Sequence, residues 1–241
     1  MPPRTRPSSA DAFELTKLRP GETVTSRRAP APAFKVYANP HEVVALPTPS
    51  LRGGTSVYEL LSRSTGGEAE GGRLSRRELS QLLWSGAGRR HDGDATHVRA
   101  TPRAALEAYV AVSSVEGLSL GVYHYNPREH VLEQLDGQDP RPGLEAALFK
   151  AGGGVDASAL DAAAVAVLFT GVVARLPAAR ARAVRHLAFE AGAAAQTLAL
   201  AAEVLGLTVM MVGDFFDDLL AAGFQLDVTQ EPPVALALVG R

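Results

Sequence analysis

The strongest constraint on the fold is a long apolar helix placed between two candidate strands. The pattern from Arg180 to Leu205 predicts one helix that ends at Gly206, a typical C-terminal capping residue. A buried strand is predicted before it at residues 164–173, and another follows it at residues 207–213. Polar residues interrupt the apolar stretch often enough to make a membrane span costly. We therefore expect this helix to pack against a sheet.

The other predicted elements interleave strands with helices. In the helix pattern at residues 74–84, Ser75 and Glu78 have the spacing of a capping box. Strands are predicted at residues 106–115, 121–127 and 232–240, and further helices at residues 56–64, 144–150 and 214–224. This order predicts an α+β or mixed α/β fold.

Composition excludes several classes of function. The 24 basic and 26 acidic residues nearly balance, which argues against a nucleic-acid binder with a global basic field. The chain has no cysteine, and its histidines lack metal-ligand spacing, so no metal site is expected. We expect no contact with a membrane and a cytoplasmic protein, because no signal peptide is visible.

The N-terminal segment differs from the rest of the chain. Residues 1–33 are rich in proline and mostly non-periodic, with six basic and three acidic side chains. Such a segment buries too little apolar surface to offset its ordering entropy. We predict a disordered tail at residues 1–33 and one folded domain at residues 34–241. A docking arm for a partner is the alternative.

Four sequence motifs, in their order along the chain, resemble the SagB-type dehydrogenases of the FMN-dependent nitroreductase superfamily. The motifs are ANPHEVVALPTP, LSRRELSQLLWSGAG, VEGLSLGVYHYNPREHVLEQL and HLAFEAGAAAQTLALAAEVLGLTVMMVGDFFDD. The resemblance implies a nitroreductase-like α+β fold, with a mixed sheet packed with helices and the long central helix at a dimer interface. It also implies FMN at a site shared by two chains, and oxidation of azoline rings (thiazoline and oxazoline) to azoles in ribosomally made peptides.

The first flavin motif of the family is only partly present. Where the family has an Arg-Arg-Ser-x-Arg word that anchors the phosphate, this chain has Arg63 and Ser64 without the outer basic positions. An arginine offers a planar fork of donors for a phosphate. A solvated helix end explains the same residues equally well.

The loop that lies along the flavin ring in the family is shortened here. Arg99 fits its beginning, Arg103 replaces a serine, and Ala105 replaces a glycine. The chain then enters the next strand about four residues early. Because alanine restricts the close approach that glycine allows, this loop argues against ordinary flavin binding.

A Lys-Tyr pair that the resemblance assigns to proton removal is missing. The corresponding positions hold Ala178 and Ala179, which have no titratable group. The turn at Gly213 and Asp214 is better preserved. Its backbone N–H groups could face a flavin, or Asp214 could be the N-cap of the following helix. The polar residues at positions 91–97 are expected to form a solvated loop.

Three functions remain open. The first is a degenerate subunit that dimerises with an intact SagB-type dehydrogenase and completes its FMN site. The second is an active homodimeric FMN-dependent oxidoreductase that acts on a peptide. The third is a peptide-binding module derived from the fold. We favour the degenerate subunit, because the catalytic and flavin motifs are largely lost while the motifs that indicate the fold remain.

Overall fold

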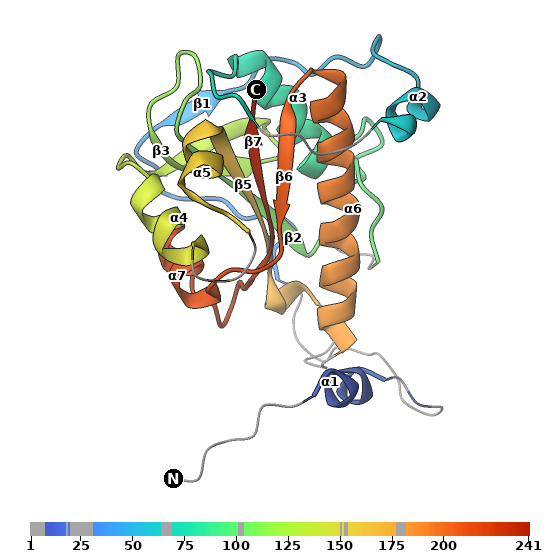
Figure 1. The fold of residues 1–241 in the computed structure, drawn as a ribbon. Helices are drawn as coiled ribbons and strands as arrows, with labels where there is room; N and C mark the ends of the chain where they lie inside the picture. Colours follow the sequence, from blue (N-terminus) through green and yellow to red (C-terminus); the bar gives the residue numbers. More distant parts are fainter. Residues whose placement is uncertain are drawn as a thin grey trace.

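An antiparallel sheet with the strand order β1-β4-β3-β2-β5-β7-β6 organises the chain (Figure 1). The computed structural model describes residues 8–17, 19, 31–63, 69–100, 104–149, 151, 154–176 and 182–241. The strands are β1 Val43–Ala45, β2 Leu106–Val112, β3 Gly121–Asn126, β4 Val131–Asp136, β5 Ala163–Gly171, β6 Thr208–Val212 and β7 Pro233–Gly240. Each neighbouring pair of these described strands is antiparallel, so the α+β class is confirmed and the predicted mixed sheet is corrected.

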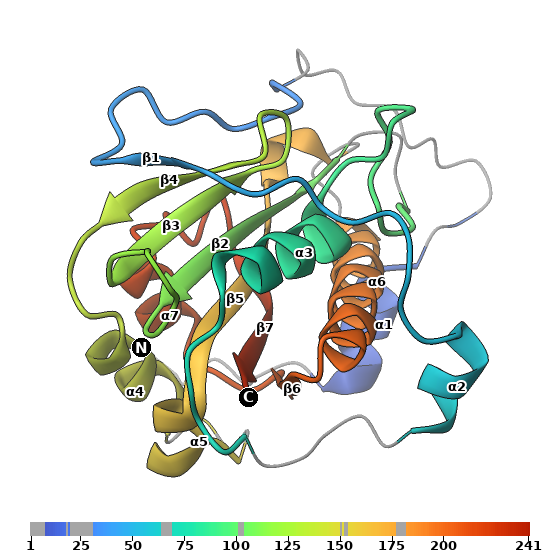
Figure 2. The same ribbon diagram turned by 90° about the horizontal axis from the view of Figure 1, so that it is seen from above.

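Helices cover both faces of the sheet. On one face lie α3 Arg76–Ala87 and α6 Arg182–Val204, and on the other lie α4 Arg141–Leu148, α5 Ala157–Ala162 and α7 Asp217–Gly223 (Figure 2). Alternate residues of β5 therefore enter two separate cores. Val167 and Phe169 contact the α3/α6 side, whereas Ala166 and Leu168 contact the other side. This two-sided burial explains the continuous apolar run that predicted a buried strand.

The helix α3 begins and packs as its sequence predicts. Ser75 caps it: the Ser75 N–H donates to Glu78 Oε2 at 2.7 Å, and the Glu78 N–H donates to Ser75 Oγ at 3.2 Å. Near its end Gly86 faces α6, where a Cβ would lie 3.1 Å from Leu198 Cβ. Glycine thus allows α3 and α6 to pack closely.

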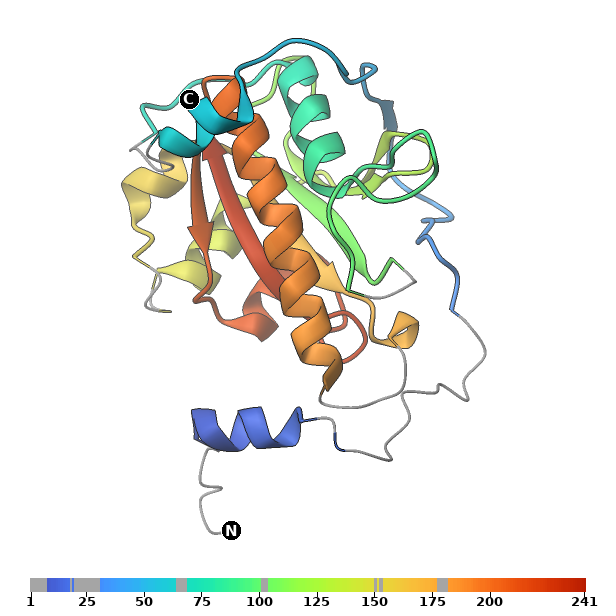
Figure 3. The same cartoon turned by 90° about the vertical axis from the view of Figure 1, so that its right-hand side faces the viewer.

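The long helix is confirmed as α6, and residues 180–181 of its predicted start lie outside the described residues. Short helices α2 Val57–Ser62 and α1 Ser9–Leu15 lie near its two ends (Figure 3). The sequence predicted α2 but not α1, which falls within the expected tail. Arg182 Nη1 of α6 donates to Thr16 O at 3.3 Å, so this part of the N-terminal segment contacts the domain.

The last helix begins later than the sequence suggests. α7 starts at Asp217 after Phe216, which is its N-cap without a side-chain bond, and Asp217 and Asp218 lie in its first turn. Asp214 is exposed and is not the N-cap, which corrects that alternative. Among the described residues, no helix is both long and apolar enough to cross a membrane.

Candidate functional site

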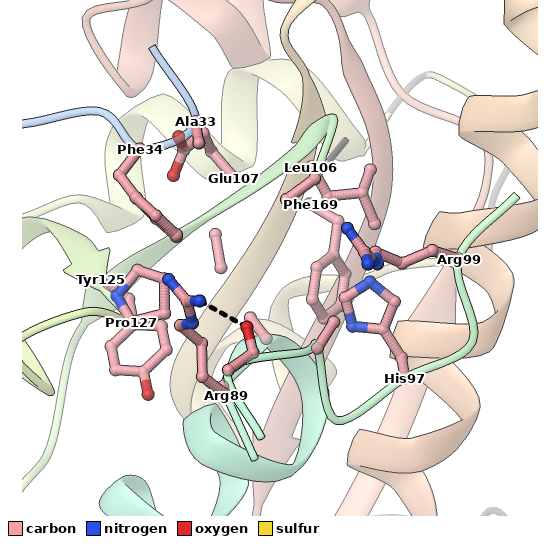
Figure 4. Close-up of a pocket in the computed structure, with 16 residues that line it drawn as sticks. Ala33, Phe34, Arg89, His97, Arg99, Leu106, Glu107, Tyr125, Pro127 and Phe169 are labelled. Carbon is pink, nitrogen blue, oxygen red and sulfur yellow. Dashed lines mark hydrogen bonds between the residues drawn. The ribbon is translucent and has the colours of Figure 1, made fainter. Parts of the chain in front are cut away.

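A cavity of about 230 Å³ opens between the end of α3, the start of β2 and the segment that precedes β1 (Figure 4). We call it the inner cavity. Its walls are Ala33, Phe34, Ala87, Gly88, Arg89, Gly93, Ala95, His97, Arg99, Ala104, Leu106, Glu107, Ala108, Tyr125, Pro127 and Phe169. Apolar and aromatic side chains dominate this lining, and cationic groups stand at its sides. Such a cavity suits a flat apolar group that carries an anionic substituent.

Arg89 forms one side of the inner cavity. Its guanidinium carbon lies 4.4 Å from the centre of the Phe34 ring, a cation–π distance, and its Nη2 donates to Gly93 O. In Figure 4, His97 and Arg99 stand across the cavity from Arg89, with Phe169 on their side. Two arginines of the loop between α3 and β2 therefore approach the cavity from opposite sides.

His97 and Arg99 are held by the loop between α3 and β2. His97 Nδ1 lies 3.0 Å from Gly86 O, and because a carbonyl only accepts, this nitrogen carries the proton. Burial lowers the pKa of His97, and it outweighs the charge of Glu190 and the bond to Gly86, which both raise this pKa. The imidazole is therefore neutral at neutral pH, with Nε2 as an acceptor. Arg99 forms an ion pair with Asp94, and a quarter of its side chain is exposed.

Behind the inner cavity lies a buried ionic cluster that crosses several strands. His124 of β3 has Glu107 at 3.0 Å and Glu133 at 2.7 Å, and Arg175 Nη1 lies 2.6 Å from Glu107. All four side chains are almost completely buried. Arg175 also donates to Pro32 O at 2.8 Å, so the cluster attaches the segment that forms one wall of the cavity.

A second group of the same cluster centres on Glu231, just before β7. Lys35 Nζ lies 2.6 Å from Glu231 and donates to the Tyr109 hydroxyl at 2.7 Å. Tyr109 and Thr170 hydroxyls donate to Glu231 at 2.8 and 2.7 Å. Burial disfavours the ammonium, but Glu231 and Tyr37 raise the pKa of Lys35 overall. The Lys35 ammonium therefore stays charged although it is largely buried.

The family model of the nitroreductase family matches residues 73–241. This chain belongs to the nitroreductase family. Every element around the inner cavity except the segment of residues 31–34 falls within that match. No curated protein sequence matches the chain.

Solved structures with the same fold support the family. A nitroreductase-like protein of Ralstonia eutropha has a TM-score of 0.70 and 25% identity, and the likeness covers 90% of this chain and 96% of that one. An Anabaena variabilis protein of the same description has a TM-score of 0.69 and 24% identity, with 83% of this chain and 41% of that chain covered. The E. coli microcin synthetase McbBCD complex, with truncated pro-MccB17 bound, has a TM-score of 0.59 and 21% identity over 99% of this chain and 84% of that one. The last two likenesses show the fold alone.

Among the described residues, those predicted to bind a flavin do not all lie at the inner cavity of this chain. Arg99 lines the inner cavity. Arg63 ends α2 and pairs with Glu59 at 2.7 Å and with Glu203 of α6 at 3.5 Å. Gly213 and Asp214 are exposed after β6 and are not among the described walls of the cavity.

Four other predicted positions lie outside the described residues: Ser64, Arg103, Ala178 and Ala179. In contrast, Arg89 and His97 line the cavity although the sequence did not predict them. His97 was expected in a solvated loop, but packing on Gly86 partly buries it. The described residues contain no group of three or more histidine, aspartate or glutamate side chains placed to hold a metal.

Proposed function

We propose that this nitroreductase-fold chain is a SagB-type subunit of a peptide azoline dehydrogenase system. In this proposal it dimerises with an intact relative and completes the FMN site of that partner. The sequence motifs, the family and the α+β fold support it. The McbBCD neighbour, a multi-subunit synthetase complex with a peptide bound, has the same fold and fits a role beside other subunits.

The observation that carries the proposal is the division of the predicted flavin residues between separate places. The inner cavity contains Arg99, whereas Arg63 lies on α2 and Gly213 follows β6. A single chain therefore offers an apolar cavity with cationic sides that suits a flavin ring, but it does not bring its predicted phosphate anchor there. A site shared by two chains brings such parts together across an interface.

Two features favour the degenerate subunit over an active homodimer. Arg63 is not among the described walls of the inner cavity, and its guanidinium faces the carboxylates of Glu59 and Glu203 instead. Ala178 and Ala179 replace the Lys-Tyr pair that the family resemblance assigns to proton removal. The partner would then supply the acid–base chemistry, and this chain would supply surface and cavity walls.

Large apolar side chains are exposed on α6 and on the elements beside it. On α6, Val184 is 63% exposed and Phe189 is 55% exposed, and Tyr58 of α2 is 85% exposed. Met210 and Met211 of the edge strand β6 are also exposed. A partner chain packed along α6 would cover several of these exposed apolar side chains. This surface supports dimerisation through α6.

The test is the visible spectrum of the purified chain, alone and after co-expression with an intact SagB-type dehydrogenase. We expect a colourless protein alone and, on co-expression, a yellow heterodimer that releases FMN on denaturation. The variant Phe189→Glu should abolish the complex, because it places a charge in the interface. The control Leu120→Glu lies in a loop before β3, away from α6, and should leave the complex intact.

Two other results would replace the proposal. A yellow chain that forms a homodimer by itself would establish the second function, an active FMN-dependent oxidoreductase, for which the cationic cavity at Arg89 and Arg99 is the supporting observation. A chain that stays colourless and forms no complex would contradict both flavin proposals.

A further inference from the structure

A second cavity adjoins the inner one on the surface side of α3. We call it the outer cavity. Its volume is about 410 Å³, and it is lined by Thr48, Pro49, Trp84, Arg89, Arg90, Pro127, Arg128 and His130. Arg89 and Pro127 line both cavities. The two spaces are therefore neighbours that share one wall.

The wall between the cavities is fixed by the turn after α3. Trp84 Nε1 donates to Arg89 O at 3.0 Å, and Gly88 lies directly against the Trp84 ring. A Cβ at position 88 would lie 2.6 Å from Trp84 Cδ1, closer than real Cβ atoms come. Any other residue at position 88 would clash with Trp84. Glycine at this position therefore allows the backbone to turn back over the indole ring. Arg89 is then held on Phe34, with its guanidinium at the boundary.

The floor of the outer cavity is neutral. His130 Nε2 lies 3.1 Å from Pro47 O, which only accepts, and His130 Nδ1 lies 2.8 Å from the Tyr125 hydroxyl. This arrangement places the proton on Nε2 and lets Nδ1 accept from Tyr125. Burial lowers the pKa of His130, consistent with an uncharged ring. The positive charge of this cavity therefore comes from its arginines.

The arginines can accept a new anionic partner. Arg90 pairs with Asp92 at 3.3 Å and with Asp94 at 3.4 Å, and Arg128 pairs with Glu129 at 3.4 Å. About half of the Arg90 side chain and two thirds of the Arg128 side chain are exposed. Exposed pairs of this kind contribute at most about 1 kcal/mol and exchange readily. None of the described residues that line the outer cavity is acidic.

We propose that the outer cavity binds an acidic segment of a peptide whose neighbouring residues enter the inner cavity. This inference deepens the proposed function, on which it rests, by naming the charge of the substrate beside the site. Arginine forks suit carboxylates, and Trp84 and Pro127 offer apolar surface to a peptide backbone. The shared wall favours an extended chain over a small anion, since one anion fills only one of the spaces.

The charge of the N-terminal segment argues against that segment as the occupant. The first 30 residues carry six basic and three acidic side chains, a net charge of +3, so the arginines repel the N-terminal segment. The proposed occupant is a negatively charged segment of another molecule.

The test is fluorescence anisotropy with two labelled synthetic peptides, one alternating glutamate with glycine and one alternating glutamine with glycine. The flavin-free chain should bind the glutamate peptide about tenfold more tightly than the glutamine peptide at low salt. The double variant R90E/R128E should remove this preference. The control R73E/R77E changes two exposed arginines near the opposite end of α3 and should keep it.

Three results would overturn the inference: equal binding of both peptides, an unchanged preference in R90E/R128E, or loss of the preference in R73E/R77E. Displacement of the glutamate peptide by inorganic phosphate, but not by chloride of equal ionic strength, would show a site for free anions and would also overturn it. Because the assay contains neither flavin nor partner, its failure is distinct from failure of the spectral test of the proposed function.

Discussion

Nε2 of His124 lies 3.0 Å from a carboxylate oxygen of Glu107 in the interior of the protein. The other ring nitrogen faces Glu133 at 2.7 Å, so both nitrogens must donate if both carboxylates are ionised. Burial disfavours the imidazolium, but these hydrogen bonds raise the pKa of His124 overall. Burial would likewise raise the pKa of Glu107, yet His124 and Arg175 lower it. The cluster is thus a chain of charged donors and acceptors.

The variant His124→Gln should lower the stability of the protein most at mildly acidic to neutral pH. Breaking a buried, paired charge costs about 3–5 kcal/mol. A raised pKa means that the stabilisation by His124 is fully present below its usual value of 6.5 and is lost as the pH rises through the raised pKa. Urea unfolding from pH 6 upward should therefore show a difference from the unaltered protein that shrinks with pH.

The exposed His91 provides the matched control, and His91→Gln should leave both stability and its pH dependence unchanged. A pH-independent effect of His124→Gln would show that the ring is neutral. The carboxylates of Glu107 and Glu133 affect the stability of the protein at acidic pH instead. The lowered pKa of Glu107 and of Glu133 gives stabilisation above their usual 4.5 that is lost as the pH falls through the lowered values.

The elements that sequence predicts best are those whose signals are local. The Ser75–Glu78 capping box, the apolar run of β5 and the long α6 each depend on residues close in sequence. The buried cluster is different, because Lys35 and Glu231 are 196 positions apart. Their pairing follows from the path of the segment before β1, which brings Lys35 to the residues that precede β7, and no local pattern contains this path.

The candidate site was only partly predictable for the same reason. Arg99 was expected from the family resemblance and lines the inner cavity, but His97 and Arg89 became part of it through loop packing. A signal for the cluster existed in Glu107, a charged residue inside an otherwise apolar strand. Such a residue indicates a buried ionic partner without identifying it.

The variant Lys35→Met should destabilise the protein by about 1–3 kcal/mol, since it leaves Glu231 buried with only hydroxyl donors. The double variant K35M/E231Q should recover part of the loss, because no unpaired charge then remains. Urea denaturation of both gives the comparison. The exposed Lys17 of the Lys17–Glu14 pair is the control, and Lys17→Met should change stability by less than about 0.5 kcal/mol. Equal effects of Lys35→Met and Lys17→Met would contradict a role for Lys35 in stability.

The variant Gly88→Ala should displace Trp84, the only tryptophan of the chain. Overpacking of this kind costs about 1–3 kcal/mol. The emission spectrum of the protein reports the change directly, and we expect a shift toward longer wavelength as the indole becomes more exposed. Gly137→Ala is the control, because its Cβ would lie at an ordinary 3.6 Å from Gln134 Nε2. An unshifted spectrum for Gly88→Ala would mean that the turn relaxes without moving the indole.

The variant Gly192→Ala separates the stability of the chain from its assembly. Gly192 is exposed in the middle of α6, and a Cβ there meets no atom within 4 Å. Alanine should stabilise the isolated chain by about 0.5–1 kcal/mol, because glycine is a poor helix former. If the partner packs closely against α6, the same methyl group should weaken the complex, which light scattering measures at several concentrations. Gly143→Ala in α4 should show the gain in stability without the loss of assembly, since it lies on the other face of the sheet. A Gly192→Ala protein that is more stable and assembles normally would place the interface on a different surface.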